Sequence, residues 1–276
     1  MANHPKRFEI DRWDSELNPS KNELKERIKG KFGIVCTPLN TTLDKEVIAA
    51  AGENDLKVVS TVSTGLNHLD IEELKSRNIR VGFGYTPDVS VPAVAEHAIA
   101  LLLATGRRVV EAHNAILNTF EAKVNNLDAM GDSALIILIT ADKLGAEFQS
   151  LDFIITESDF IIVALAQTAQ TKGIFNRARI NSMKSNAILI NIARGDLLDE
   201  AALIEALQNK KIAGAGLDVF HEEPLPLDNP FMKLHNVVLS PHIAYNTHDC
   251  RKSMEELAAL NVLAVLNGDK MPAEVL

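Results

Sequence analysis

Short apolar runs alternate with helical patterns along most of this sequence, and this alternation is what most restricts the fold. Seven runs are continuously apolar and rich in β-branched residues, as is typical of strands buried on both faces. They are GIVC (33–36), LKVVST (56–61), IRVGF (79–83), DFIIVAL (159–165), AILINI (187–192), AGLDV (215–219) and NVVLS (236–240). The alternation predicts an α/β fold with doubly wound parallel sheets.

Helical patterns lie between these runs. They are LDKEVIAAAG with Gly52 as a stop, LDIEELKSRN, PAVAEHAIALLLATGRRVVEAHNAI and DEAALIEALQNKK with Asp199 as a cap. The long helix is expected to run from Pro92, in its first turn, to about residue 118. It is apolar on more than one face, so we expect it to pack in a core on one side and against a domain or subunit on the other. A wholly intramolecular core helix carries about equal weight.

Composition and charge argue against several classes of protein. The 276 residues include 37 acidic and 28 basic side chains, a net charge of −9, which disfavours a general surface for nucleic acid or anionic membranes. No run approaches the ~18 apolar residues of a membrane span, and the charged start does not resemble a secretory signal. Cys36 and Cys250 lack the spacing of a disulfide framework or a zinc site. We therefore expect a cytoplasmic protein that binds no metal.

Three polar residues follow consecutive strand candidates, at the edge where open parallel sheets bind ligands. Arg194 follows AILINIA, Glu223 follows GLDVF and His242 follows NVVLSP. An arginine can hold the carboxylate of a small 2-oxo acid through two parallel hydrogen bonds. A histidine can donate a proton to the carbonyl oxygen as hydride arrives, and a glutamate can orient its ring. The trio therefore indicates reduction of a 2-oxo acid with a nicotinamide cofactor.

Each member of the trio has an ordinary structural explanation when it is taken alone. Arg194 could cap a helix or pair with Asp196 or Asp199. His242 could be a turn residue, and Glu223 could be a solvated loop charge. It is the combination, in the order Arg, Glu, His with spacings of 29 and 19 residues, that favours a functional site.

Longer segments around the trio resemble a known family. NIARGDLLDEAALIEAL, IAGAGLDVFHEEPLP and VVLSPHIA are similar to the signature blocks of the D-isomer-specific 2-hydroxyacid dehydrogenases, whose matching Arg, Glu and His are the catalytic set. Similarity to the glyoxylate/hydroxypyruvate reductases lies in STVSTGLNHLDIEELKSRNIRVGFGYTPDV, AEHAIALLLATGRR, EPLPLDNP and GDKMPAEVL. The resemblance spans most of the chain outside about residues 118–145. It implies hydride transfer between NADPH or NADH and a small 2-oxo acid, giving a D-2-hydroxy acid.

The resemblance also implies roles for other positions. Ser63, Thr64 and Gly65 match the loop whose backbone amides receive the substrate carboxylate, although the same residues could simply form a tight strand-to-helix turn. The positions implied to line the cofactor cleft are Ala166, Thr168, Ile192, Ala193 and, near the nicotinamide amide, Asp218. The long helix from Pro92 is implied to build a homodimer interface.

The nucleotide-binding motif is where the sequence departs from the family. A dinucleotide normally lies on GxGxxG at a strand-to-helix turn, and the sequence contains no GxGxxG. In SALIILITADKLGAEF, Thr140, Asp142 and Gly145 would occupy the three glycine positions, and Asp142 would oppose the pyrophosphate. A βαβ unit takes ~30 residues or more. Gly145 to Ser158 spans 13, so we expect a helix and a strand to be missing.

These features predict two α/β domains between which the chain crosses twice. Residues 1–90 with a C-terminal helix at 249–276 would form the substrate-binding domain, which begins at the second strand by family standards. Residues 91–248 would form a shortened, Rossmann-like NAD(P)-binding domain. Two functions stay open: a glyoxylate or hydroxypyruvate reductase, or a noncatalytic isoform or interaction protein with a degenerate cofactor site. A further hypothesis is that Tyr245 narrows the cleft and alters which 2-oxo acid fits.

Overall fold

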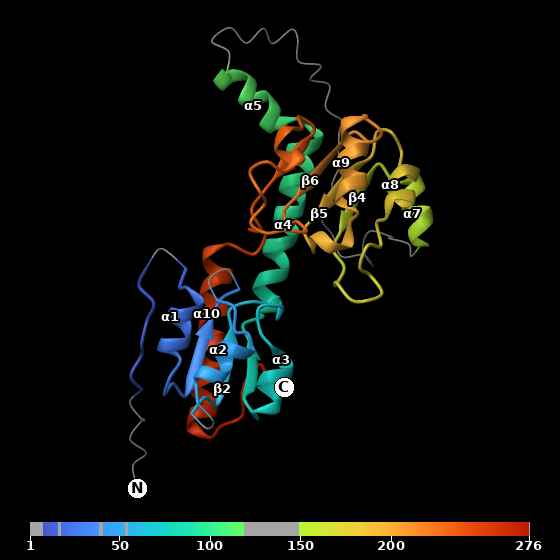
Figure 1. Ribbon diagram of the computed structural model, residues 1–276. Coiled ribbons are helices and arrows are strands. Elements are labelled where there is room, and N and C mark those ends of the chain that lie inside the picture. The colour runs from blue at the N-terminus through green and yellow to red at the C-terminus, as the bar shows by residue number, and fades with distance from the viewer. Residues whose placement is uncertain (1–7, 16–17, 39–40, 53–54, 119–148, 276) are drawn as a thin grey trace. The chain divides into compact units, whose positions relative to one another are not determined.

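The computed structural model describes residues 8–15, 18–38, 41–52, 55–118 and 149–275 (Figure 1). The chain divides into two compact units, which we call unit 1 (Met1–Ser90 with Thr247–Leu276) and unit 2 (Val91–Asn246). The predicted turn with Thr140, Asp142 and Gly145 lies outside the described residues.

Unit 1 is built on a three-stranded parallel sheet. Its strands, in sheet order, are β1 (Gly33–Cys36), β2 (Val58–Thr61) and β3 (Arg80–Phe83). Its helices are α1 (Lys21–Arg27), α2 (Lys45–Ala50), α3 (Ile71–Ser76) and α10 (His248–Asn267).

Helices cover both faces of this sheet. Val59 and Val81 join a buried cluster with residues of α2 and α3. Ser60 points to the opposite face, because side chains alternate along a strand, and there Asn261 of α10 donates to its hydroxyl at 3.1 Å. In Figure 1 α10 runs along the sheet as the long red helix. Unit 1 is therefore a layered α/β sandwich.

The C-terminal segment does not continue α10 to the end of the chain, so the predicted helix over 249–276 is too long. Gly268 adopts a left-handed conformation (φ 84°), which ends the helix after Asn267. The chain then pairs with β3, where Phe83 N donates to Ala273 O at 3.2 Å. The buried amide of Asn261 fixes this segment by accepting from Ala273 N at 2.9 Å.

Unit 2 is built on a four-stranded parallel sheet. Its strands, in sheet order, are β4 (Phe160–Val163), β5 (Ile188–Asn191), β6 (Gly214–Leu217) and β7 (Val237–Leu239). Its helices are α4 (Pro87–Gly106, which begins in unit 1), α5 (Val109–Asn118), α7 (Leu151–Glu157), α8 (Arg177–Ser182) and α9 (Glu200–Gln208). Two short 3₁₀ helices are η2 (Gly195–Leu197) and η3 (Pro230–Lys233).

This sheet is also covered on both faces, which confirms the predicted α/β class with doubly wound parallel sheets. On one face α7, α8 and α9 bury a large apolar cluster against the sheet. On the other face Leu101 and Leu102 of α4 pack against Ile188 and Ile190 of β5. Helix α4 is long and apolar enough to pass a length-and-composition test for a membrane span. Its packing on β5 accounts for that composition as a core helix.

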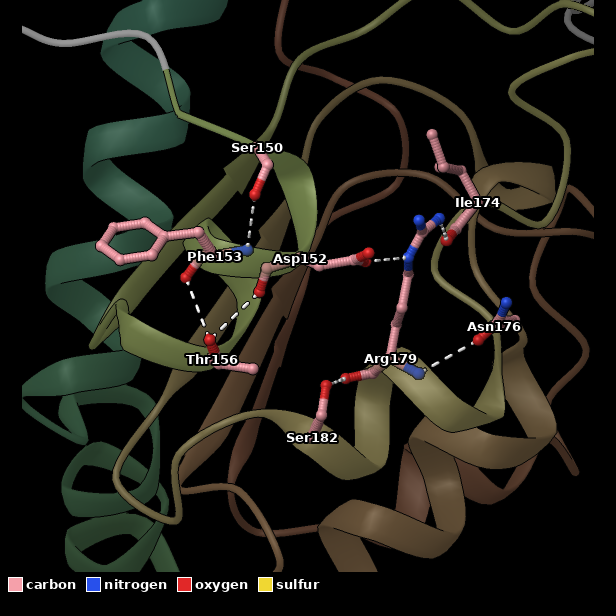
Figure 2. Close-up of polar contacts among 8 residues, drawn as sticks. All are labelled: Ser150, Asp152, Phe153, Thr156, Ile174, Asn176, Arg179 and Ser182. Atoms are coloured by element: carbon pink, nitrogen blue, oxygen red, sulfur yellow. Dashed lines mark hydrogen bonds and ion pairs between the residues drawn. The ribbon is translucent and has the colours of Figure 1, made fainter.

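Side-chain hydrogen bonds begin α7 and α8 and tie them together (Figure 2). Ser150 accepts from Phe153 N at 3.2 Å, and Asn176 accepts from Arg179 N at 3.0 Å. Arg179 reaches Asp152 at 2.9 Å and donates to Ile174 O at 2.8 Å. These bonds hold the two short helices in one layer on the sheet.

The long helix predicted from Pro92 is two helices. Helix α4 begins five residues earlier, at Pro87, so Pro92 lies in its second turn rather than its first. Helix α4 ends at Gly106, and α5 starts at Val109 after Arg108 has adopted a left-handed conformation (φ 53°). A left-handed residue cannot continue a right-handed helix, so the apolar pattern runs on while the helix is interrupted.

Candidate active site

The loops that leave β5, β6 and β7 carry the predicted trio. Arg194 follows the end of β5, Glu223 follows β6 and His242 follows β7. The three strands are parallel neighbours, so their carboxyl ends lie at one edge of the sheet. The trio is therefore brought to a single edge of unit 2.

His242 and Glu223 form a hydrogen-bonded pair at this edge. His242 Nδ1 lies 2.6 Å from Glu223 Oε2, and each side chain is about one-third exposed, at 31% and 33%. The other oxygen of Glu223 accepts from Phe220 N at 2.9 Å. Burial alone would raise the pKa of Glu223, but the bonds from His242 and Phe220 and the charge of Arg194 bring it below its usual value. The carboxylate is thus ionised and orients the ring, leaving Nε2 as its second donor position.

Arg194 is held in a turn by a buried asparagine. Asn191 donates from Nδ2 to Arg194 O at 2.9 Å, and its Oδ1 accepts from Ala193 N at 3.1 Å. Arg194 Nη1 donates to Ala193 O at 2.6 Å. Among the residues that the structure describes, none accepts from the remaining N–H groups of the guanidinium. Those groups are therefore available to an anionic ligand.

A tight loop crossing sets the Arg194 turn against the loop that leads to Glu223. A Cβ on Gly195 would lie 2.0 Å from the carbonyl carbon of Phe220 and 2.2 Å from His221 N. These are backbone atoms, which cannot move aside as a flexible side chain can. Only glycine permits this approach.

The loop that carries His242 is organised by the carboxylate of Asp218. Asp218 has no exposed surface. Its oxygens accept from Ser240 Oγ at 2.6 Å and from the backbone N–H groups of Ile243 and Ala244, both at 2.9 Å. His242 N donates to Asp218 O at 2.8 Å, and His242 itself adopts a left-handed conformation (φ 55°). Asp218 therefore fixes the backbone from which the imidazole projects.

His97 on α4 completes this network. Its Nε2 lies 2.9 Å from Ser240 Oγ and 3.3 Å from Asp218 Oδ1. Since Ser240 gives its single proton to Asp218, its oxygen accepts from His97 Nε2–H. The helix is thereby linked to the loop that bears His242.

Asp196 joins the loops on the other side of Arg194. Its carboxylate lies 3.0 Å from Gln167 Nε2 and 3.1 Å from Lys172 Nζ, and it also contacts His221 Nδ1. Burial would raise the pKa of Asp196, and the bonds from Lys172 and His221 outweigh this and lower it. Asp196 thus ties the loops after β4 and β6 to the turn that carries Arg194.

The positions implied to line the cofactor cleft lie in the loops after β4, β5 and β6. Ala166 and Thr168 are exposed, and Ile192 and Ala193 are half-buried. Thr171 Oγ1 bonds to both Ala166 O (2.8 Å) and Thr168 N (2.7 Å), which shapes the first of these loops. Asp218, by contrast, uses both oxygens within unit 2, so its implied place near the nicotinamide stays a prediction. No group of three or more metal-ligating side chains comes together within the described ranges.

Ser63, Thr64 and Gly65 form the turn that follows β2 in unit 1. Ser63 Oγ donates to Gly65 O at 2.6 Å and lies 3.0 Å from Thr61 Oγ1. Within the described part of the chain, no acceptor is found for the backbone N–H of Thr64 or Gly65. The turn therefore presents amides that could bind an anion.

Reasoning from the sequence missed four polar residues that support these loops. They are His68, His97, Asn191 and Ser240. Asn191 carried a signal, because an asparagine inside the apolar run AILINI has to find partners where it is buried. The others had no comparable signal, since their partners lie on other elements.

The sequence matches the family model described as "D-isomer specific 2-hydroxyacid dehydrogenase, NAD binding domain" over residues 96–244. It is 38% identical to the human protein named glyoxylate reductase/hydroxypyruvate reductase, over 97% of this chain and 90% of that protein. That alignment runs over 301 positions, more than the 276 residues of this chain. The human protein therefore carries residues that this chain lacks.

Two solved structures are similar over nearly the whole chain. A protein from Thermus thermophilus superimposes with a TM-score of 0.81 at 32% identity, covering 94% of this chain and 91% of that one. An NADPH-dependent glyoxylate/hydroxypyruvate reductase from Sinorhizobium meliloti, solved with NADP and malonate, superimposes with a TM-score of 0.71 at 28% identity. That match covers 88% of this chain and 83% of the other.

Proposed function

Because the chain belongs to the D-isomer-specific 2-hydroxyacid dehydrogenase family, we propose that it reduces glyoxylate, hydroxypyruvate or a related small 2-oxo acid with NADPH or NADH. The observation that carries this proposal is the 2.6 Å contact between His242 Nδ1 and Glu223 Oε2 at the sheet edge that also bears Arg194. The product would be a D-2-hydroxy acid, as the family name states.

Each member of the trio has one task in this reaction. Arg194 offers its free N–H groups to the substrate carboxylate and aligns the 2-oxo group. His242 donates a proton from Nε2 to the carbonyl oxygen as the C–H bond forms. Glu223 holds the ring through Nδ1 and gives the positively charged imidazole an ionised partner. The nicotinamide cofactor, when bound, supplies the hydride.

The described residues fit the nicotinamide end of such a cofactor. The exposed turn at Ala166 and Thr168 and the half-buried Ile192 and Ala193 place small or apolar groups along the strand ends. Neither loop puts a carboxylate at these positions. The predicted pyrophosphate turn at 140–145 lies outside the described residues, so the proposed shortening of the nucleotide-binding part rests on the sequence.

By resemblance, the turn that follows β2 is also a binding site for the substrate carboxylate. The backbone N–H groups of Thr64 and Gly65 would receive it, with Ser63 shaping the turn. Backbone amides suit this task, because they bind an anion without adding a mobile charge.

The test is oxidation of NADPH and NADH by the purified chain with glyoxylate and with hydroxypyruvate. We expect turnover that Arg194→Ala lowers by at least about a hundredfold, since it removes the charged partner of the carboxylate. Arg194→Lys should recover only part of it, because lysine cannot bind a carboxylate in a bidentate manner. Turnover equal to that of Arg194→Ala would refute the proposal. An accompanying failure to bind NADPH or NADH would favour the noncatalytic alternative.

Tyr245 is the candidate for selecting substrate size. Its ring lies edge-on to His242, with 6.2 Å between the ring centroids. A bulky ring beside the proton donor would favour the small 2-oxo acids. Tyr245→Ser should therefore raise kcat/KM for larger 2-oxo acids relative to glyoxylate, and an unchanged ratio would exclude this role.

We further propose a cytosolic homodimer. Leu103, Val109 and Val110 are exposed large apolar residues on α4 and α5, which the resemblance implies as the dimer interface. Both cysteines are free and buried, which fits a reducing compartment. Light scattering after size exclusion should give twice the chain mass, and Leu103→Glu should reduce it to that of one chain.

A further inference from the structure

A buried histidine lies beneath the turn that follows β2. His68 is only 8% exposed, and its Nε2 is 2.8 Å from the hydroxyl of Thr61, the fully buried last residue of β2. Thr61 Oγ1 is in turn 3.0 Å from Ser63 Oγ, which donates to Gly65 O at 2.6 Å. Four groups thus form a continuous chain from the core of unit 1 to the exposed turn.

The proton count gives this chain a single direction. Each hydroxyl has one proton. Ser63 uses its proton on Gly65 O, so Ser63 Oγ must accept from Thr61. Thr61 has then used its own proton, so it must accept from His68, whose Nε2 is the protonated nitrogen. The chain runs His68 Nε2–H to Thr61, then to Ser63, then to Gly65 O.

The core holds the start of this chain in place. His68 O accepts from Leu43 N at 2.9 Å, and Asp70 N donates back to Leu43 O at 2.9 Å. Leu43 itself is 1% exposed. The backbone that carries the imidazole is therefore fixed. The hydroxyls of Thr61 and Ser63 connect the imidazole to the turn.

The cluster is also neutral. Burial lowers the pKa of His68 to about 4 and raises that of Cys36, whose Sγ is 4.0 Å from Nε2, to about 12. Near neutral pH neither group is charged. The turn is thus held without a negative charge that would repel a carboxylate or a positive charge that would bind it in the wrong place.

We infer that His68 is a positioning residue that fixes the Ser63–Gly65 turn for carboxylate binding, an inference that rests on the proposed function. The bond from Ser63 Oγ to Gly65 O closes a ring that contains the Ser63–Thr64 and Thr64–Gly65 peptide units. These planar units carry the N–H groups of Thr64 and Gly65, so the ring restricts the directions in which both N–H groups point. His68 thereby decides the orientation of amides that it does not touch.

The test compares His68→Leu, which removes the donor, with His68→Gln, which keeps an N–H donor near the position of Nε2. In His68→Leu we expect the KM for glyoxylate to rise about tenfold, as for the loss of one hydrogen bond, while the KM for NADPH changes less than about twofold. His68→Gln should restore the glyoxylate KM to within about threefold. Ser63→Ala cuts the same chain at its last link without touching the core, and serves if His68→Leu does not fold.

Nuclear magnetic resonance on the unliganded chain keeps this test separate from that of the proposed function. The ¹H–¹⁵N signals of Thr64 and Gly65 should shift or broaden in His68→Leu and stay in place in His68→Gln. The His68 ring should show the Nε2–H form. An Nδ1–H ring, or turn signals that are unchanged in both His68→Leu and Ser63→Ala, would overturn the inference even if the enzyme is active. An inactive wild-type chain with the expected signals would refute the function and leave the positioning role supported.

Discussion

Two loops that follow parallel strands are held in opposite ways. In unit 2 the loop that carries His242 is gathered around the ionisable carboxylate of Asp218, which takes one hydroxyl and two backbone donors. In unit 1 the turn after β2 is gathered around the neutral imidazole of His68 and two hydroxyls. Both anchors are buried, at 0% and 8% exposure. They differ in charge.

The difference follows from what each loop is proposed to hold. His242 is proposed to donate a proton, and two carboxylates support it: Glu223 bonds to its ring and Asp218 bonds to its loop. The turn in unit 1 must receive a carboxylate, and two like charges about 4 Å apart cost about 1 kcal/mol in water and several near a protein surface. A neutral anchor avoids this repulsion. The supporting group in unit 1 therefore does not repel the proposed anionic ligand.

The largest effect is expected from removing the proton donor itself. His242→Gln keeps a polar side chain but cannot deliver a proton, so we expect kcat for glyoxylate to fall by about 10²–10⁴. His235→Gln replaces an exposed histidine of the same unit and serves as the control. Steady-state kinetics with both variants measures the effect. A kcat within about threefold of the wild type would show that His242 is not the donor.

Asp218→Asn breaks the charged anchor. One carboxylate oxygen becomes an NH₂ group that faces the donors of Ser240, Ile243 or Ala244. We expect a loss of about 2–3 kcal/mol in the free energy of unfolding, as for buried hydrogen bonds to a charged group, and a lower kcat because His242 is displaced. Urea titration followed by circular dichroism measures the stability, with the exposed Asp228→Asn as the matched control. Equal stability of the two variants would rule out an anchoring role.

The neutral anchor, His68, predicts how the free energy of unfolding depends on pH. The pKa of His68 is about 4 when folded and near 6.5 when unfolded, so the unfolded chain binds the extra proton between these values. Stability should therefore be complete above pH 6.5 and fall as the pH drops toward 4, by on the order of 2 kcal/mol. The difference between wild type and His68→Gln in urea titrations isolates this contribution. Parallel curves for the two proteins would contradict it.

The lowered pKa of Glu223 acts in a lower window. Its contribution is present above the ordinary carboxyl value and is lost as the pH falls through the folded value. The fall between pH 6.5 and 5 should thus depend on His68 and hardly on Glu223. Stability of Glu223→Gln in the same range provides the check: it should keep the slope that His68→Gln loses.

Thr105 is a buried polar residue that neither anchor supports, and its substitution should have the smallest effect on stability. Its buried hydroxyl on α4 has no hydrogen-bond partner among the described residues and lies close to Gly216. Thr105→Val removes an unsatisfied polar group at constant shape, so we expect stability to change by about 0 to +1 kcal/mol. Differential scanning calorimetry can resolve the shift. A loss above about 1 kcal/mol would mean that the hydroxyl has a partner.

Local pattern was enough to predict the sheets and the position of Arg194, Glu223 and His242 after three neighbouring strands. Each of the seven predicted strands contains or overlaps a strand of the structure, because continuous β-branched runs have few other stable arrangements. The helix predicted from Pro92 ends where expected, at Asn118, but it begins five residues earlier and is interrupted. The interruption depends on the backbone of Arg108 rather than on the apolar pattern. The C-terminal helix was overextended for a related reason. The sequence contains Gly268, which can end a helix. That the segment after it pairs with β3 could not be predicted from the sequence.

By itself, the sequence determined that this chain is a two-sheet α/β protein of a hydroxyacid dehydrogenase family with Arg194, Glu223 and His242 at strand ends. Only the tertiary structure decided what holds them. The resemblance implies that Asp218 lies near the nicotinamide, and the structure adds that its two oxygens bond to Ser240, Ile243 and Ala244. Buried polar groups must be satisfied in three dimensions, and their partners come from residues far away in sequence. Spacing identifies the candidate reacting groups, whereas packing identifies the residues that position them.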